Sequence, residues 1–376
     1  MVGAILGAGG VSLVISWMVT MAMVRLAVRF GFVDKPGGRK IHANPKPLGG
    51  GVAIFLGFAL PLLGVLIVLN CITIANKPGD LFTAYLSGAV KRTPMAICLI
   101  VATAAMHILG LIDDRRALGP FLKLVVQLSI IAAFVIPFQE MRILSVLDTR
   151  CGTHGLISAT LAILWIGVIT NAFNFLDNMD GLSGGVAAVS ATAFLIATLS
   201  IEQWFVAGSL AMLLGALLGF LFWNFPPAKI FMGDSGSLVI GMVLGVLTVL
   251  TTYLPPGRQW GAGWYAVFMP VIVMALPLYD LLVVSALRIS RGKSPFVGDT
   301  NHFSHRLVAR GMSRRTAVLC LYLVTAATAI GGILLPHVNS PFAAVLIFVQ
   351  TLLVLGVVAL LEQHPLPLKS EISNLK

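Results

Sequence analysis

The chain has 376 residues, of which 58% are hydrophobic and 10% are charged, and its mean hydropathy is +0.98. A water-soluble protein of this length needs a far more charged surface, so the composition excludes an ordinary soluble enzyme. The net charge of +11 would suit nucleic acid binding, but the positions of Lys and Arg along the chain favour a different explanation.

Eleven apolar runs follow one another along the chain, each close to the roughly 20 residues that span a bilayer. The first run has no basic segment before it and no convincing cleavage site, so we expect a retained helix rather than a signal peptide. We predict an all-α polytopic membrane protein with one integral-membrane domain over residues 1–361 and a short polar tail over 362–376. The runs cover residues 4–27, 48–74, 93–112, 121–138, 154–173, 185–200, 204–222, 237–254, 264–287, 316–336 and 342–361.

The basic residues are divided unequally between the two sides that eleven spans would create. One side, with the helix ends beside it, holds 19 of the 25 Lys and Arg, and the other side holds six. Because cytoplasmic segments carry the basic excess, we place the N-terminus outside and the C-terminus in the cytoplasm. Topology and contact with anionic lipids thus account for the positive charge, and no nucleic acid partner is expected. The four cysteines form no CxxC pair, which favours packing thiols over a metal site.

The loop after the first run, from Asp34 to Gly51, combines basic residues with many prolines and glycines. Prolines and glycines exclude a regular helix there. Lys46 lies close to the start of the second run, where a rigid basic loop could hold a diphosphate. Basic cytoplasmic loops are the rule, so Lys46 alone is a weak signal.

Two adjacent acids, Asp113 and Asp114, end the third run. An acid at a membrane boundary is costly to keep and marks a functional site by default. One carboxylate could help to hold Mg²⁺, or act as a base toward a phosphate or hydroxyl. The alternative is a helix-end pair neutralised by Arg115 and Arg116. Lys123 follows ten residues after Asp113 and could return to the same place as a phosphate-binding charge.

The string from Asn171 to Gly181 follows the fifth run and places Asn171, Asn174 and Asp177 on one helix face. Amide and carboxylate oxygens on one face suit a hard cation, and they also suit the donors of a nucleobase edge. The alternative is a capped helix end in which Asp180 and Gly181 form a turn.

Small residues surround the single acid of the string Phe231 to Ser237. Gly233 and Gly236 would let the backbone approach a ligand closely. Asp234 could also be the N-cap of the eighth run, and a helix start is itself a natural place for an anion or a metal.

The loop after the ninth run is long and basic and contains His302, His305 and Arg306. Their i, i+3, i+4 spacing would bring them together on a helix. The trio could bind a pyrophosphate or a sugar, or ligate a metal. Zinc is disfavoured, because no thiolate accompanies the histidines and the nearby acids prefer Mg²⁺. The alternative is an ordinary basic loop that sets topology.

In this order and in these loops, the strings resemble the polyprenyl-phosphate N-acetylhexosamine-1-phosphate transferases, glycosyltransferase family 4. They are most similar to the bacterial branch that uses UDP-GlcNAc and undecaprenyl phosphate. The resemblance covers nearly the whole chain, and the strings that carry it lie between Pro45 and Arg306. It implies an enzyme of the bacterial cytoplasmic membrane that transfers a sugar-1-phosphate, foremost GlcNAc-1-phosphate, from a UDP-sugar to undecaprenyl phosphate and releases UMP. It also implies a requirement for Mg²⁺, with Mn²⁺ as a substitute, and dimers occur in the family.

The resemblance assigns roles position by position. Asn174 and Asp234 match positions that hold Mg²⁺ on the diphosphate, with Asp114 in the same metal region. Asp113 matches the proposed base toward the lipid phosphate, so Asp113, Asp114 and Asp234 are the expected catalytic acids. The expected substrate-binding residues are Lys46, Lys123 toward the diphosphate, Asn171, Asp177, Asp180 near the uracil, and His302, His305 and Arg306 toward the sugar and diphosphate.

The chain departs from the family pattern at Ser304, where the GlcNAc branch often has another histidine, and at Asn178, where Gly is common. The first departure concerns sugar recognition and the second the turn near the nucleotide. The muramyl-pentapeptide branch remains an alternative, although its histidine-rich string is absent from this sequence. A cation-coupled transporter is the alternative from another class, favoured by Asp280 inside the ninth run. Direct attack by the lipid phosphate is the preferred mechanism, with double displacement also open.

Overall fold

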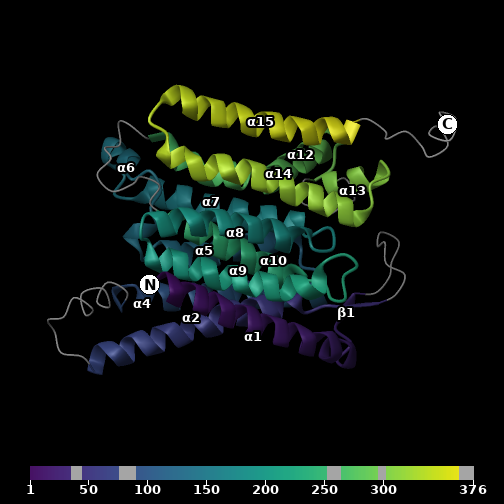
Figure 1. Cartoon of the computed structure of the whole chain (residues 1–376), viewed down its shortest axis with the longest axis horizontal. Coiled ribbons are helices and arrows are strands. Elements are labelled where there is room, and N and C mark those ends of the chain that lie inside the picture. The colour runs from purple at the N-terminus through teal and green to yellow at the C-terminus, as the bar shows by residue number, and fades with distance from the viewer. Residues whose placement is uncertain (35–44, 76–89, 252–263, 295–301, 364–376) are drawn as a thin grey trace.

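The computed structural model describes residues 1–34, 45–75, 90–251, 264–294 and 302–363. Long helices lie side by side in one bundle, with α14 and α15 along one edge and α1 and α2 along the other (Figure 1). The helices are α1 (Val2–Arg29), α2 (Gly50–Ala75), α4 (Thr93–Arg115), α5 (Pro120–Val135), α6 (Val146–Cys151), α7 (Leu156–Leu176), α8 (Leu182–Ser200), α9 (Trp204–Asn224), α10 (Asp234–Leu250), α11 (Met269–Val273), α12 (Ala275–Ser290), α13 (Phe303–Ala309), α14 (Arg314–Leu334) and α15 (Pro341–Gln363), with 3-10 turns η1 (Gln139–Met141), η3 (Trp264–Phe268) and η4 (Leu335–His337).

Helix makes up most of the described length of each of the eleven predicted runs, which confirms an all-α polytopic membrane protein. Among the described residues, eight helices are long and apolar enough to cross a membrane. The ninth run is broken, because η3–α11 and α12 meet at an angle of 68°. The helices α5 and α10 are shorter than a usual span, so the number of eleven spans stays a prediction.

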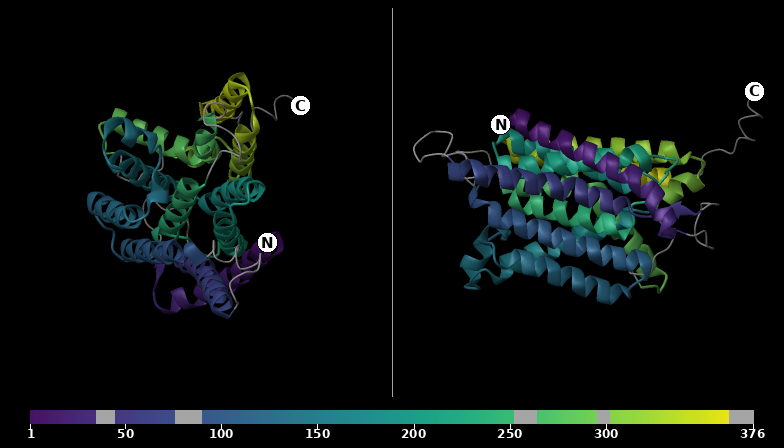
Figure 2. Two further views of the ribbon diagram at one scale, coloured as in Figure 1. Left: turned by 90° about the vertical axis from the view of Figure 1, so that its left-hand side faces the viewer. Right: turned by 90° about the horizontal axis from the view of Figure 1, so that it is seen from below.

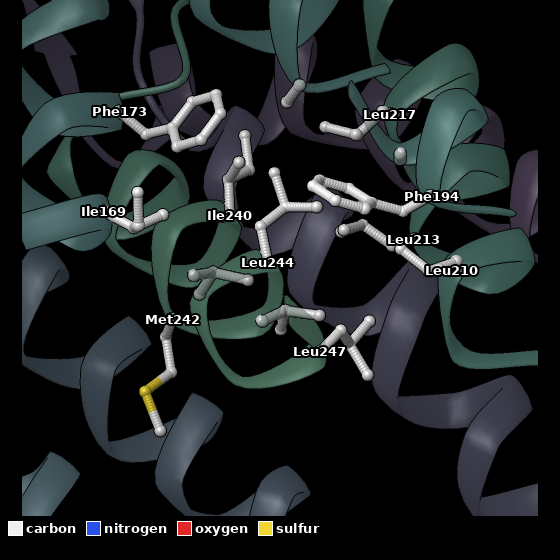
Figure 3. Packing of buried hydrophobic residues seen from close by; sticks show 14 of the residues in the cluster. Ile169, Phe173, Phe194, Leu210, Leu213, Leu217, Ile240, Met242, Leu244 and Leu247 are labelled. Atoms are coloured by element: carbon white, nitrogen blue, oxygen red, sulfur yellow. The ribbon is translucent and has the colours of Figure 1, made fainter. Parts of the chain in front are cut away.

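Helix α10 lies at the centre of the bundle, where it contacts α2, α4, α7, α8 and α9 (Figure 2). Nearly all of its residues are buried. Apolar side chains of α7, α8 and α9 surround those of α10 in the core (Figure 3). A short central helix can end in a polar site because its neighbours shield its apolar length from lipid.

The close approach of α4 to α10 requires Gly110. A Cβ atom at this position would overlap the backbone nitrogen and Cα of Ser235 at the start of α10. Small residues let membrane helices pack with their backbones in near contact. Gly110 therefore brings the acid end of α4 against the first turn of α10.

The outer helices face the surroundings with apolar side chains. In both α1 and α15, 17% of the apolar window is buried inside the protein. Large exposed groups such as Leu6, Phe342 and Leu352 cover the remaining faces, as expected where lipid is the solvent. All four cysteines are free, including Cys71 and Cys151.

The first loop forms a small antiparallel ladder at one end of the bundle. Strands β1 (Val33–Asp34) and β2 (Lys46–Pro47) pair there, and Leu48 forms a parallel bridge with Phe231. As predicted, Asp34 and residues 45–49 are not helical, whereas Gly50 and Gly51, the last residues of the predicted loop, begin α2. The bridge brings Lys46 and the start of α2 beside the string that contains Asp234.

Candidate active site

A single ammonium group lies at the meeting point of α4, α5, α7 and α10. Lys123 Nζ donates to Asp113 Oδ2 at 3.1 Å and to Asn174 Oδ1 at 3.4 Å, and it also contacts Asp234 Oδ2. The exposed fractions of the Lys123, Asp113 and Asp234 side chains are 13%, 15% and 28%. Four predicted residues from distant parts of the sequence thus form one cluster, which we call the Lys123 cluster.

Asn174 holds a fixed orientation in the Lys123 cluster. Its amide nitrogen donates to Asp234 Oδ1 at 2.8 Å and to Ser237 Oγ at 2.9 Å. Its amide oxygen faces Lys123. Sequence reasoning did not assign a role to Ser237, although its hydroxyl one turn after Asp234 was the available signal.

The two adjacent acids of α4 serve different partners. Asp113 Oδ1 accepts from the backbone nitrogen of Leu118 at 2.5 Å, while its other oxygen faces Lys123. The guanidinium of Arg115 lies over the ring of Phe32, 5.5 Å from its centroid. Lys123 therefore neutralises Asp113, and the alternative of neutralisation by the following arginine is wrong for Arg115.

Asp114 binds the start of α10. Its Oδ1 accepts from the Asp234 backbone nitrogen at 2.8 Å and its Oδ2 from that of Ser235 at 3.1 Å. The N-cap of α10 is Gly233, with a positive φ of 72°, so the reading of Asp234 as the N-cap is wrong. Asp114 caps this helix from another helix and leaves the Asp234 side chain free to face Lys123.

His107 strengthens the same junction and was missed in the sequence. Its Nδ1 lies 2.9 Å from the carbonyl oxygen of Ser235, and its ring stacks on Phe55. His107, Gly110 and Asp114 recur at helical spacing on one face of α4, which was the signal that could have identified it. This face of α4 sets the position of Asp234.

Asn171 lies one turn from Asn174, beneath the Lys123 cluster rather than in it. Its side-chain nitrogen donates to Gln127 Oε1 at 3.0 Å and to the Gly167 carbonyl at 2.8 Å. Gln127 is buried, and its amide nitrogen has no partner among the described residues. The predicted face that includes Asn171 and Asn174 is real, but Asp177 lies beyond the helix as its C-cap.

Asp177 and Asp180 follow α7. Removal from water, and then the negative charges of Asp234, Asp114 and Asp180, raise the pKa of Asp177 well above its ordinary value. Asp180 Oδ2 accepts from the Ala228 backbone nitrogen at 2.9 Å. Asp177 therefore belongs electrostatically to the acids of the site, whereas Asp180 orders the loop before α10.

Lys46 contacts the same loop residue as Asp180. Its ammonium donates to the Ala228 carbonyl at 2.8 Å. Lys46 and Asp180 thus bind the two sides of one peptide segment, next to the bridge between Leu48 and Phe231. They form a second polar group beside the Lys123 cluster.

The trio of the last loop lies on α13, and each member has a separate partner. The predicted helix is confirmed, with His302 as its N-cap and His305 and Arg306 within it. His302 Nδ1 lies 2.7 Å from Asp280 Oδ2. Arg306 Nη2 and Nε bind Glu362 Oε2 at 2.5 and 3.0 Å.

The pKa of His305 lies below its ordinary value because the ring is buried and because His302 and the positively charged Arg314 lie near it. Glu362, placed in the tail by the sequence, belongs to α15, which extends to Gln363. Sequence reasoning missed Glu362 as a partner and read Asp280 as a sign of transport. The available signal was an acid in an apolar run, which needs a partner when it is buried.

The two departures from the family pattern contact each other. Ser304 Oγ donates to Asn178 Oδ1 at 2.5 Å, and Asn178 Nδ2 donates to the Phe175 carbonyl at 2.8 Å. His305 is also hydrogen-bonded to the backbone of Asn178. Asn178 thus holds α13 against the end of α7.

The Lys123 cluster offers oxygen atoms to a cation. No group of three or more His, Cys, Asp or Glu suited to a metal occurs among the described residues. Instead Asp113, Asp234 and the amide oxygen of Asn174 converge on one positive charge. Such an all-oxygen donor set fits Mg²⁺ or Mn²⁺ and does not fit a thiophilic metal.

Residues 96–252 match the model of glycosyl transferase family 4. A Bacillus subtilis protein named "Probable undecaprenyl-phosphate N-acetylglucosaminyl 1-phosphate transferase" is 31% identical over 90% of this chain and 87% of its own length. The decaprenyl-phosphate N-acetylglucosaminephosphotransferase of Mycolicibacterium smegmatis is 33% identical over 85% of this chain and 79% of its own length. The undecaprenyl-phosphate alpha-N-acetylglucosaminyl 1-phosphate transferase of Yersinia pestis is 27% identical over 82% of this chain and 78% of its own length.

Proposed function

This chain belongs to glycosyl transferase family 4, and we propose that it transfers GlcNAc-1-phosphate from UDP-GlcNAc to undecaprenyl phosphate, releasing UMP. The observation that carries this proposal is the Lys123 cluster, in which one ammonium is surrounded by the oxygens of Asp113, Asn174 and Asp234. The names of the relatives supply the sugar and the class of lipid acceptor. The product would initiate a cell-envelope polysaccharide.

The reaction joins two anions. An oxygen of the lipid phosphate attacks the phosphorus that bears the sugar, and the bond from that phosphorus to the UMP oxygen breaks. Phosphoryl transfer depends on positioning and on neutralising spread negative charge rather than on covalent help from the protein. Lys123 provides a positive charge held among acids, and Asp113 is the proposed proton acceptor for the lipid phosphate.

A divalent cation fits the same place. Asn174 Oδ1 and Asp234 Oδ2, with Asp113 Oδ2 beside them, are the oxygens that would hold Mg²⁺. When bound, the ion would supply further neutralisation of the diphosphate. Both oxygens of Asp114 accept from backbone amides, so we propose that Asp114 supports the metal region by fixing α10.

We propose that the active site faces the cytoplasm of a bacterial inner membrane, with the N-terminus outside and eleven spans. The helix ends that form the site lie toward the end of the bundle where β1 and α13 are found (Figure 1). The loops at this end carry most of the Lys and Arg. A water-soluble nucleotide sugar and a lipid phosphate can meet there.

The transporter alternative loses its main support in the structure. Asp280, the acid that favoured it, is paired with His302 beside α7. Because the chain belongs to a transferase family, we assign the remaining acids of the site to the transfer reaction. Transfer of phospho-MurNAc-pentapeptide is the alternative within the family. Comparing the activity with the two UDP-linked donors distinguishes it from GlcNAc-1-phosphate transfer.

The test is UMP release by the purified protein with UDP-GlcNAc, undecaprenyl phosphate and Mg²⁺. We expect activity with UDP-GlcNAc above that with UDP-GalNAc or UDP-MurNAc-pentapeptide, and a loss of activity in Asp234→Ala. Absence of UMP with all three donors would refute the transferase proposal. UMP release without any lipid acceptor would instead support double displacement.

A further inference from the structure

Asp280 and His302 form a buried pair between α12 and α13. Asp280 Oδ2 lies 2.7 Å from His302 Nδ1, and the exposed fractions of the two residues are 0% and 5%. Burial of an acid is costly unless a partner compensates it. The pair explains why an acid is retained in an otherwise apolar helix.

The pair lies against the end of α7 that carries the Lys123 cluster. Phe175, the residue after Asn174, meets the His302 ring edge-on with centroids 6.2 Å apart. The guanidinium of Arg288 lies 5.0 Å from the centroid of the same phenylalanine ring. Asp280 and Arg288 are buried two helical turns apart on one face of α12, so this face supports both α7 and α13.

The hydrogen bond also determines which nitrogen of His302 can meet a substrate. A carboxylate only accepts hydrogen bonds, so Nδ1 carries the hydrogen that Asp280 receives. Nε2 lies across the ring from Nδ1, and in this tautomer it carries a lone pair. It is therefore the nitrogen that can accept a hydrogen bond from a bound ligand.

We propose that Asp280 is a positioning residue for the transfer reaction, which fixes the orientation and tautomer of His302 so that Nε2 accepts a hydrogen bond from a hydroxyl of the nucleoside-diphosphate sugar. This inference rests on the proposed substrate-binding role of His302. A pair that only fastens α13 to α12 would affect stability alone. Asp280 would instead act on turnover through His302, without touching the substrate.

A double-mutant cycle tests the proposal, with kcat and KM for UDP-GlcNAc measured for Asp280→Ala, His302→Ala and the double variant. We expect Asp280→Ala to lower kcat/KM on the order of 10–100-fold, the usual cost of losing a residue that orients an active-site group. In the His302→Ala background the same change should have no further effect. Asp280→Asn should recover part of the activity, because its amide oxygen can still accept from Nδ1.

Asp148→Asn is the matched control, because it alters a buried aspartate of α6, a helix at the opposite end of the bundle from α13 (Figure 1). Asp148 accepts from Thr153 Oγ1 at 2.6 Å and from the Ile157 nitrogen at 3.0 Å. We expect this variant to lower the unfolding temperature while kcat/KM for UDP-GlcNAc is unchanged. It shows what lost stability alone does to turnover.

Two results would overturn the inference while the transferase proposal stands. One is a folded Asp280→Ala variant with wild-type kcat/KM. The other is independent, additive losses in the double variant. An unaffected His302→Ala variant would overturn both the substrate-binding role of His302 and the inference. If Asp280→Ala does not fold, the same cycle is measured with Asp280→Asn, whose partial loss must disappear in the His302→Ala background.

Discussion

Replacement of Lys123 by glutamine removes the ammonium that Asp113 and Asp234 share and leaves a neutral side chain of similar length. Asp113 and Asp234 both contact the ammonium, and the side chains of these two acids and of Lys123 each have an exposed fraction below one third. At an effective dielectric constant of about 20, two unit charges about 4 Å apart attract by about 4 kcal/mol before desolvation is subtracted, and both acids lie closer than that to the ammonium. The variant therefore loses two such interactions and leaves two facing carboxylates.

We expect kcat/KM for UDP-GlcNAc to fall about 100- to 1,000-fold, as when a positioned group that stabilises transition-state charge is removed. That change corresponds to about 3–4 kcal/mol. Lys123→Arg keeps the charge and should retain part of the activity. UMP release, measured at saturating and limiting UDP-GlcNAc, separates kcat from KM.

Lys229→Gln is the control for the loss of one positive charge. Lys229 lies 5.0 Å from the ring centroid of Trp223, and it is not part of the Lys123 cluster. We expect its kcat/KM to remain close to the wild-type value. A Lys123→Gln variant that is folded and within threefold of wild type would refute the electrostatic role derived from the cluster.

The remaining predictions concern residues that surround and position the Lys123 cluster. Asp114→Ala should lower the free energy of unfolding by about 0.5–2 kcal/mol, because the first amides of α10 lose their acceptor; an unchanged unfolding temperature would contradict this. Gly110→Ala should push α4 from α10 and reduce UMP release, whereas Gly64→Ala, with open space around its Cβ, should leave it unchanged; equal activities would refute the close-approach argument. The raised pKa of Asp177 means that the folded state retains a proton which the unfolded state loses above pH 3.8, so stability falls as pH rises from there through the folded pKa. Unfolding temperatures across pH should show a smaller fall for Asp177→Asn, and parallel curves would count against the raised pKa.

Much of the bundle could be predicted because hydropathy is a local property. All eleven apolar runs are mostly helical where described, since a buried or lipid-facing backbone must satisfy its hydrogen bonds within the helix. The break at Met274 in the ninth run was not predicted, although Pro270 and Pro277 flank it. Proline restricts the chain locally, but the packing of neighbouring helices sets the angle.

The positions of the acids could also be predicted from the sequence, because a charge at the end of an apolar run is conspicuous. Their binding partners could not be predicted in this way. Asp113 and Asp114 are adjacent, but successive residues on a helix point about 100° apart. One therefore reaches Lys123 and the other the backbone of α10.

The sequence by itself determined the class of protein, the order of the helices and the residues that gather at one end of the bundle, because each depends on local composition and spacing. Only the tertiary structure decided which acid neutralises which base. The partners of His302 and Arg306 lie 22 and 56 residues away, at Asp280 and Glu362. Such pairs form where helices that are separate in the sequence pack together, and no local sequence pattern predicts which helices will do so.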